Sequence, residues 1–311
     1  MRAITLAVLA VLFAVAYGAT LINDVNLINR VNTNPKASWK AVAHKQFEGK
    51  TLEHMKGMLG TYIPQAETVH IPRSNPAVTK AVPTSFDASK NWPSCKTLQQ
   101  IRDQQQCGSC WAFSGAEVLG DRFCIATNGS VNVALSPEYI LECDTTDYGC
   151  NGGYLSNEWQ FLASTGTTTD ACQPYVSGGG DVPECPTTCQ DGSPIKLYKA
   201  DQKTIQLFDP SNLAAAQQDI MTYGSIQMGF MVYQDFFTYS SGVYRHLHGG
   251  LAGGHAVKVT GWGVDSASGL PYWIVANSWN TSWGMNGYFW ILRGSNECDC
   301  ESQLYSARPQ V

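Results

Sequence analysis

The cysteines of this chain are confined to one part of it. All eleven lie between Cys95 and Cys300, and the residues before Cys95 contain none. In an oxidising compartment an odd number of cysteines indicates an even set of disulfides plus one free thiol. The part of the chain after residue 82 is therefore expected to fold as a disulfide-bonded unit. One of its thiols is expected to stay unpaired, either as a catalytic group or without a role.

The N-terminus indicates the compartment. Arg2 precedes an apolar run from Ile4 to Ala16, and Ala16-Tyr17-Gly18 has the small-x-small pattern of a cleavage site. This order is typical of a secretory signal peptide, and the run is too short to span a bilayer. Residues 1–18 are therefore predicted to be a signal peptide, and the cysteines can oxidise after export.

Between the signal peptide and the cysteine-rich part, the composition changes twice. Residues 20–62 alternate charged and apolar side chains in a helical pattern, whereas residues 63–82 are rich in proline and small polar residues. A proline-rich stretch of this kind suits an extended, exposed linker. We expect residues 19–81 to form a removable pro-segment and residues 82–311 to form the mature domain.

The overall composition limits the class of protein. The chain has 311 residues, of which 44% are hydrophobic and 14% charged, and this balance is that of a globular protein with a large core. The net charge of −5 argues against nucleic acid or an anionic membrane as the main partner. No second CxxC or regular histidine pair completes a zinc site, so neither a metal nor a cofactor is expected.

The mature region changes character midway. Helical patterns dominate up to about residue 224: the run after Cys110, the stretch that begins at Ser136-Pro137, and residues 212–223. Strand patterns follow, at residues 226–232, 255–259, 272–276 and 288–292. A helical lobe followed by a β lobe, with a cleft between them, is the expected architecture.

The segment Cys107-Gly108-Ser109-Cys110 is the sharpest chemical signal. Because a helical run follows it, Cys110 lies at a helix N-terminus, where backbone N–H groups and the helix dipole favour a thiolate. A thiolate attacks carbonyl carbon. Two other interpretations stay open at this point: Cys110 in a structural disulfide, or Cys107 and Cys110 as the redox pair of a thiol-disulfide oxidoreductase.

Two later segments favour the nucleophile. Gly254-His255-Ala256 opens an alternating strand, and Asn277-Ser278-Trp279 follows another strand. A nucleophile, a base and a residue that orients the base are the parts of a nucleophilic protease site. His246 and His248 lie in a glycine-rich stretch without a strand pattern, so we interpret them as solvated loop histidines.

With these motifs in place, the sequence resembles the papain family of cysteine proteases, and within it the cathepsin B-like branch. The resemblance covers nearly the whole chain after Val82. It rests on the following motifs: Pro83-Thr84-Ser85-Phe86-Asp87, Gln104, Cys107 to Phe113, Cys150-Asn151-Gly152-Gly153, Gly254-His255-Ala256, Gly261-Trp262-Gly263 and Asn277-Ser278-Trp279.

The resemblance implies an α+β, papain-like two-lobe fold with a helical left lobe, a β-barrel-like right lobe and the active-site cleft between. It implies that Cys110 is the nucleophile, His255 its proton partner, Asn277 the residue that orients the histidine, and Gln104 an oxyanion donor. It also implies that Gly60-Thr61-Tyr62 occupies the cleft of the precursor. The substrate-binding residues would be Gly152, Gly153, Tyr154, Leu155, Gly229, Gly254, Ala256, Trp279 and Gln303, and the disulfides Cys95–Cys124, Cys107–Cys150, Cys143–Cys185 and Cys172–Cys189.

Cys298 and Cys300 fall outside this disulfide set. On an extended strand they would share a face but lie too far apart for an unstrained bond.

Two departures from the cathepsin B pattern bear on activity. Gln303 stands where that branch has an acidic side chain in the S2 pocket, so apolar P2 side chains are expected to be preferred over arginine. The connection between Cys172 and Cys185 is short and holds no histidine, where cathepsin B has a long occluding insertion. We therefore expect an endopeptidase.

The expected partners are protein and peptide substrates, the chain's own pro-segment as inhibitor, and protein inhibitors. The protein is expected to be a monomer in the secretory pathway, either in lysosome- or vacuole-like vesicles or secreted. A catalytically dead homologue that acts as a binding module is a further alternative to a protease, but the intact Gln104, Cys110, His255 and Asn277 argue against it.

Overall fold

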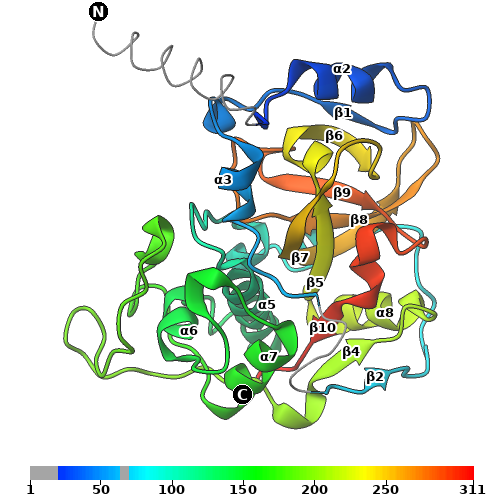
Figure 1. The fold of residues 1–311 in the computed structure, drawn as a ribbon. Coiled ribbons are helices and arrows are strands. Elements are labelled where there is room, and N and C mark those ends of the chain that lie inside the picture. The colour runs from blue at the N-terminus through cyan, green and yellow to red at the C-terminus, as the bar shows by residue number, and fades with distance from the viewer. Residues whose placement is uncertain (1–19, 64–69) are drawn as a thin grey trace, which may run out of the picture.

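The computed structural model describes residues 20–63 and 70–311 (Figure 1). The predicted signal peptide lies outside the described residues. Within the described part of the chain, every helix is too short or too polar to cross a bilayer. The helices are α2 (Val25–Thr33), α3 (Leu52–Lys56), α4 (Ala88–Asn91), α5 (Cys110–Ala126), α6 (Pro137–Cys143), α7 (Leu155–Ser164) and α8 (Leu213–Tyr223). The strands are β1 (Trp39–Ala41), β2 (Arg73–Ser74), β3 (Phe86–Asp87), β4 (Gln206–Phe208), β5 (Ile226–Tyr233), β6 (Tyr239–Tyr244), β7 (Leu251–Val264), β8 (Pro271–Ala276), β9 (Tyr288–Leu292) and β10 (Leu304–Ser306).

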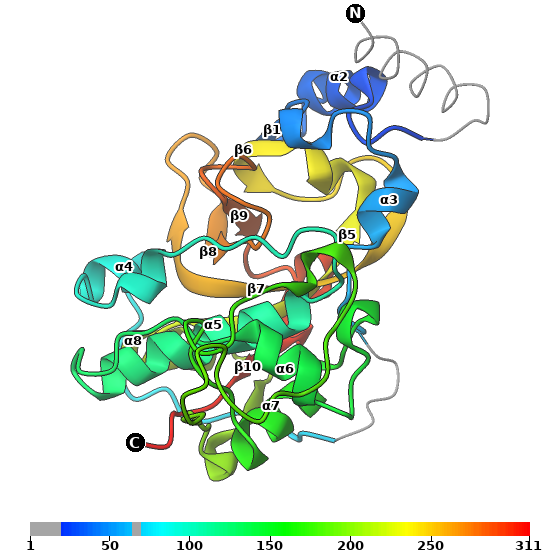
Figure 2. The ribbon, with the colours of Figure 1, turned by 90° about the vertical axis from the view of Figure 1, so that its left-hand side faces the viewer.

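Helices α5, α6, α7 and α8 gather on one side of the molecule, whereas α2 and α3 lie on the other side (Figure 2). Almost every residue of α5 is buried, because it is apolar around most of its circumference and lies between the other helices and β7. Helix α6 begins where the sequence predicts: the Ser136 hydroxyl caps it by accepting from the Tyr139 N–H, and Pro137 is its first residue. The predicted helices after Cys110, after Ser136 and at residues 212–223 are confirmed as α5, α6 and α8.

The strands form one sheet, whose β1, β6, β9 and β8 end lies on the other side, while β10, β4 and β2 extend beside α8 (Figure 1). Their order is β1-β6-β9-β8-β7-β5-β10-β4-β2, and β3 adds to β7. The four predicted strands are present as β5, β7, β8 and β9, all antiparallel to their neighbours in that series. The two-lobe α+β fold is confirmed, but the expected barrel-like closure is not found, because the path of the sheet ends in β1 on one side and β2 on the other.

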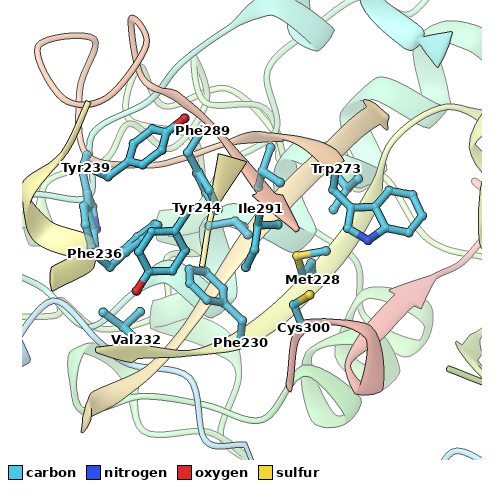
Figure 3. Close-up of a cluster of buried hydrophobic side chains, with 14 of the residues drawn as sticks. Met228, Phe230, Val232, Phe236, Tyr239, Tyr244, Trp273, Phe289, Ile291 and Cys300 are labelled. Carbon is cyan, nitrogen blue, oxygen red and sulfur yellow. The ribbon is translucent and has the colours of Figure 1, made fainter. Parts of the chain in front are cut away.

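Two large hydrophobic cores correspond to the two lobes, and a small third cluster lies around Ala88 and the Cys95–Cys124 disulfide. The core on the sheet side is rich in aromatic rings (Figure 3), among them Phe230, Phe236, Tyr239 and Phe289. The core on the helix side is built on Trp111 and its neighbours in α5, α6 and α7. Two separate cores leave a seam between the lobes, with α5 on one side of it and β7 on the other.

The N-terminal segment lies against the mature region and departs in part from its predicted helical character. Helices α2 and α3 are present, but Trp39–Ala41 form strand β1, with Trp39 and Ala41 buried and Lys40 exposed. Pairing with β6 decides this, because it gives the backbone of a three-residue stretch the hydrogen bonds that a helix turn would otherwise supply. After α3 the chain passes between the helices and the sheet (Figure 1).

Four disulfides join Cys95 to Cys124, Cys107 to Cys150, Cys143 to Cys185 and Cys172 to Cys189. These are the pairs that the resemblance implied. Cys107 is therefore bonded to Cys150 and not to Cys110, so the CxxC sequence does not form a redox pair in this structure. Cys110, Cys298 and Cys300 are free thiols.

Candidate active site

Cys110 is the first residue of α5 and is completely buried. Its sulfur receives backbone N–H groups from Trp111 of the helix, Ala256 of β7 and Gly60 of the N-terminal segment, and all three favour the thiolate. Burial outweighs them and raises the pKa of the Cys110 thiol above its usual range. With the N-terminal segment in place, the thiol is therefore kept protonated.

His255 lies in β7, and Asn277 directly follows β8, the neighbouring strand. His255 Nε2 lies 2.8 Å from Asn277 Oδ1. Because an amide oxygen only accepts, Nε2 donates, and the lone pair is on Nδ1, which has no hydrogen-bond partner among the described residues. The Trp279 ring stacks on the imidazole with centroids 4.8 Å apart, so it shields the bond between His255 and Asn277 from water.

Burial also sets the charge of the histidine. It lowers the pKa of His255 to about 4, although the hydrogen bond to Asn277 opposes this shift. At neutral pH the imidazole is therefore neutral, and Nδ1 is available as a base. With the N-terminal segment in place, the pair is thus a neutral thiol and a neutral imidazole.

Gln104 is fully buried beside Cys110, in a position that its own network fixes. Its Oε1 accepts from the Ser278 hydroxyl at 2.7 Å, so Nε2 points the other way and donates to the carbonyls of Cys107 and Met58, each at 2.8 Å. Met58 belongs to the N-terminal segment. A carbonyl of that segment therefore accepts from the amide group that the resemblance assigns to the oxyanion.

The N-terminal segment covers the nucleophile. The Thr61 hydroxyl lies 3.2 Å from Cys110 Sγ. The backbone of the segment is held on both sides, because Thr61 N–H donates to the Gly254 carbonyl at 3.1 Å and Tyr62 N–H donates to the Gly153 carbonyl at 3.0 Å. Gly153 N–H in turn donates to the Gly60 carbonyl at 2.8 Å. The structure thus places Gly60-Thr61-Tyr62 at Cys110, where the resemblance expected it.

Four of the expected substrate-binding residues, Gly152, Gly153, Tyr154 and Gly254, contact this segment. Close approach explains the glycines: a β-carbon on Gly254 would lie 2.1 Å from the Thr61 carbonyl oxygen, and one on Gly152 would lie 2.7 Å from that of Gly60. Gly229 faces Leu155 and Gln303, whose side chains would lie 3.1 and 3.2 Å from a β-carbon there. Gln303 is buried, and its backbone carbonyl accepts from Gly229 N–H at 2.9 Å.

Sequence reasoning missed two residues that hydrogen-bond to the candidate catalytic residues Gln104 and Asn277. Ser278 donates its hydroxyl to Gln104 and its backbone N–H to Asn277 Oδ1, at 2.7 and 2.8 Å. The Tyr175 hydroxyl donates to the Gln104 carbonyl at 2.7 Å. Ser278 lies within the Asn277-Ser278-Trp279 motif, so its position was a signal. Tyr175 carries no local signal.

Three interpretations outside the site are corrected. His246 lies in a loop as predicted, but it is only partly solvated: its ring stacks on that of Tyr233 with centroids 3.9 Å apart, and its Nδ1 lies 3.2 Å from Asp235 Oδ1. His248 contacts Asn34 of the N-terminal segment through Nε2 at 3.3 Å. Cys298 and Cys300 lie in a 3-10 turn and not on an extended strand.

No metal site accompanies these residues: within residues 20–63 and 70–311, no three or more His, Cys, Asp or Glu side chains are grouped to hold an ion.

Comparison with known proteins identifies the family. The family model described as papain family cysteine protease matches residues 82–308. The chain belongs to the papain family of cysteine proteases. It is 40% identical to cathepsin B-like CP2 of Giardia intestinalis over 301 residues, which cover 96% of this chain and 98% of that protein. It is 38% identical to cathepsin B-like cysteine proteinase 4 of Caenorhabditis elegans, with 89% and 90% covered.

The similar solved structures include those of papain-family proenzymes. The structure of procathepsin B S9 from Trypanosoma congolense is 34% identical and superimposes with a TM-score of 0.86, over 94% of this chain and 100% of that one. A recombinant stem bromelain precursor shares the fold, with a TM-score of 0.74 over 96% of each chain at 24% identity. This papain-family chain is therefore a cathepsin B-like cysteine protease, and its structural neighbours include proenzymes.

Proposed function

We propose that the protein is the latent precursor of a cysteine endopeptidase that acts in the secretory pathway. The observation that carries this proposal is the placement of Cys110 at the start of α5, beside the strand that bears His255, with residues 60–62 lying across it. A free, buried thiol at a helix N-terminus next to a histidine that an amide orients is the arrangement of an activated nucleophile.

The residues divide the reaction among them. Cys110 Sγ attacks the carbonyl carbon of the scissile peptide, His255 takes the thiol proton and delivers it to the leaving amine, and water then hydrolyses the acyl-enzyme. Gln104 Nε2 and the Cys110 backbone N–H bind the oxyanion. Losing one such donor costs on the order of 3 kcal/mol of transition-state stabilisation.

Latency follows from the same contacts. Residues 19–81 act as the pro-segment: Thr61 covers the sulfur, Met58 uses the amide of Gln104, and burial holds both Cys110 and His255 neutral. Removal of the segment by cleavage near Val82 admits water and substrate. Less burial brings the two pKa values towards each other, so a thiolate–imidazolium pair becomes accessible.

Cleavage within chains is supported by the connection between Cys172 and Cys185. Its residues 177–179 form a short turn held by Glu138, whose carboxylate accepts from the N–H groups of Val176 and Ser177 at 3.0 and 3.1 Å. A short connection tied down in this way leaves the primed side of the cleft open. A peptide with a free and with an amidated C-terminus should be cleaved at similar rates, and a strong preference for the free form with release of dipeptides would refute this.

The signal peptide predicted at residues 1–18 and the four disulfides support export and point to vesicles of the lysosome type or the cell exterior as the site of action. Peptides and proteins are the substrates, and the mature domain of residues 82–311 acts as a monomer.

The decisive experiment is labelling of the processed protein with a peptidyl epoxide, followed by peptide mapping. We expect modification of Cys110 alone, together with loss of peptide cleavage. Cys110→Ser should fold but remain inactive, and Cys298→Ser is the matched control because it removes another free thiol and should leave cleavage unchanged. Substantial peptidase activity in Cys110→Ser would overturn the assignment.

A further inference from the structure

Two buried carboxyl groups lie next to the strip of residues 152–154, which hydrogen-bonds to the N-terminal segment. Asp144 and Asp147 follow α6, and their exposed fractions are 5% and 8%. Their side chains hydrogen-bond to each other. Such a bond between two carboxyl groups requires a proton, because two carboxylates in contact do not both ionise in a buried site.

The donors around the pair show which residue holds the proton. Asp144 Oδ1 accepts from both the backbone N–H and the hydroxyl of Thr146, at 2.8 and 2.7 Å, and these bonds favour its ionised form. The Oδ2 atoms of Asp144 and Asp147 are buried and accept from no N–H or O–H group of the described residues. Burial raises the pKa of both carboxyl groups, but the short bonds from Thr146 oppose this shift at Asp144, so the proton of the pair belongs on Asp147. Burial, and then the charge of Asp144, raise the pKa of Asp147 to about 7.

Asp147 is joined to the peptide-binding strip by its other oxygen. Its Oδ1 accepts from Tyr154 N–H at 2.9 Å and from Asn157 Nδ2 at 3.3 Å. Gly153 lies against it, because a β-carbon there would be 2.9 Å from Asp147 Cγ. Gly153 is the residue that exchanges two backbone hydrogen bonds with residues 60–62. Asp147 thus fixes the backbone that an extended peptide has to meet.

Two further ionisable side chains face Asp144 and Asp147. Glu158 of α7 is fully buried and interacts with both carboxyl groups, and Tyr62 of the N-terminal segment interacts with Asp147. Burial raises the pKa of Glu158 well above its usual range, so this side chain is uncharged, and the repulsion on an ionised Asp147 comes from Asp144. When Asp147 loses its proton, Asp144 repels it. Because Asp147 still accepts from Tyr154 N–H, this repulsion should displace the backbone of the strip from Gly152 to Tyr154.

We propose that Asp147 is a positioning residue for substrate: the proton that it shares with Asp144 keeps Gly153 in register for an extended peptide, and loss of that proton towards neutral pH weakens peptide binding without slowing the chemical step. This inference rests on the proposed peptidase function. It assigns an acid requirement to the binding strip, separate from the titration of Cys110 and His255.

The test is the pH dependence of KM and kcat for a fluorogenic peptide, measured on enzyme that was expressed as the full chain and processed. In the unaltered enzyme KM should rise about tenfold between pH 5.5 and pH 8, the factor that corresponds to a one-unit difference in pKa between free and bound enzyme. Asp147→Asn keeps the acceptor for Tyr154 and donates permanently to Asp144, so its KM should change less than about threefold over this range. Asp147→Ala removes the acceptor and should raise KM at both pH values, with kcat unchanged.

Asp191→Asn is the matched control. Asp191 accepts from Ser193 N–H in a similar turn, but it is exposed and distant from the strip, so this variant should reproduce the unaltered profile. If KM of Asp147→Asn follows the unaltered enzyme across the pH range, or if only kcat responds, the proposal is wrong.

A binding measurement separates this proposal from the peptidase assignment. A labelled peptide with the sequence of residues 56–63 is titrated into processed Cys110→Ser protein and into Cys110→Ser with Asp147→Asn. Kd should rise about tenfold from pH 5.5 to pH 8 in the first and stay nearly constant in the second. This result would stand even if no peptidase activity were found, and equal pH dependence in both would overturn the role of Asp147 even in an active enzyme.

Discussion

The substitution Gly60→Ala tests how the proposed pro-segment blocks Cys110. A β-carbon at this position would lie 1.7 Å from the Gly108 carbonyl oxygen and 2.3 Å from its carbon. Both are backbone atoms next to the Cys107–Cys150 disulfide, so they cannot move aside as a flexible side chain would. Gly60→Ala must therefore lift the segment from the site.

The cost can be estimated from what is lost. Forcing a methyl group into a packed site costs about 1–3 kcal/mol. The displaced segment also loses the hydrogen bonds between Gly153 and residues 60 and 62, each worth about 1 kcal/mol. The total of about 3–5 kcal/mol corresponds to inhibition weakened by roughly 10²- to 10³-fold or more.

The assay adds the isolated segment, residues 19–81, to processed enzyme and measures its inhibition constant with and without Gly60→Ala. Gly57→Ala is the control, since a β-carbon there meets only the His54 carbonyl of its own helix, at 3.3 Å, and its inhibition constant should stay within about threefold. If Gly60→Ala inhibits as well as the unaltered segment, the close approach to Gly108 is not what positions the segment.

Three further predictions concern the site itself. Asn277→Ala removes the acceptor for His255 Nε2 and should lower kcat/KM about thirtyfold, as expected for a bond worth about 2 kcal/mol; an unchanged kcat/KM would show that Asn277 does not orient the imidazole. Gln303→Glu places a carboxylate beside Gly229 and should raise the cleavage of substrates with arginine at P2, relative to those with leucine at P2, by about tenfold or more; an unaltered enzyme that already favours arginine at P2 would contradict our account of this pocket. Because burial raises the pKa of Cys110 and lowers that of His255 to about 4, the precursor between pH 5 and pH 8 holds a thiol and a neutral imidazole, so iodoacetamide should alkylate Cys110 far more slowly in the precursor than after processing; equal rates would refute this.

Local patterns were sufficient for the helices and for the central strands. Ser136 and Pro137 start α6 through contacts within its first turn, so the signal is local. Strands β5, β7, β8 and β9 are long enough for their residue pattern to be recognised. Trp39–Ala41 was missed because three alternating residues within a helical pattern carry almost no signal. Its strand character comes from β6, which lies about two hundred residues later in the chain.

The catalytic candidates were found for a different reason. Cys110, His255 and Asn277 are each flanked by motif residues, so the sequence names them even though they are far apart in the chain. Asp147 carries no such signal. Its importance depends on a second carboxyl group brought to it by the turn at Thr146 and on the burial of both, and neither can be read from the order of residues.

Both outer strands of the sheet belong to the part of the chain expected to be discarded. β1 covers β6 at one end and β2 covers β4 at the other, through pairing at Trp39–Ala41 and Arg73–Ser74. Excision of residues 19–81 uncovers two rows of unpaired backbone N–H and C=O groups at once, and such rows are templates for strand pairing between molecules. On the proposed processing, the segment would thus also cover both sheet edges until activation, and its removal would leave them open to strand pairing between molecules.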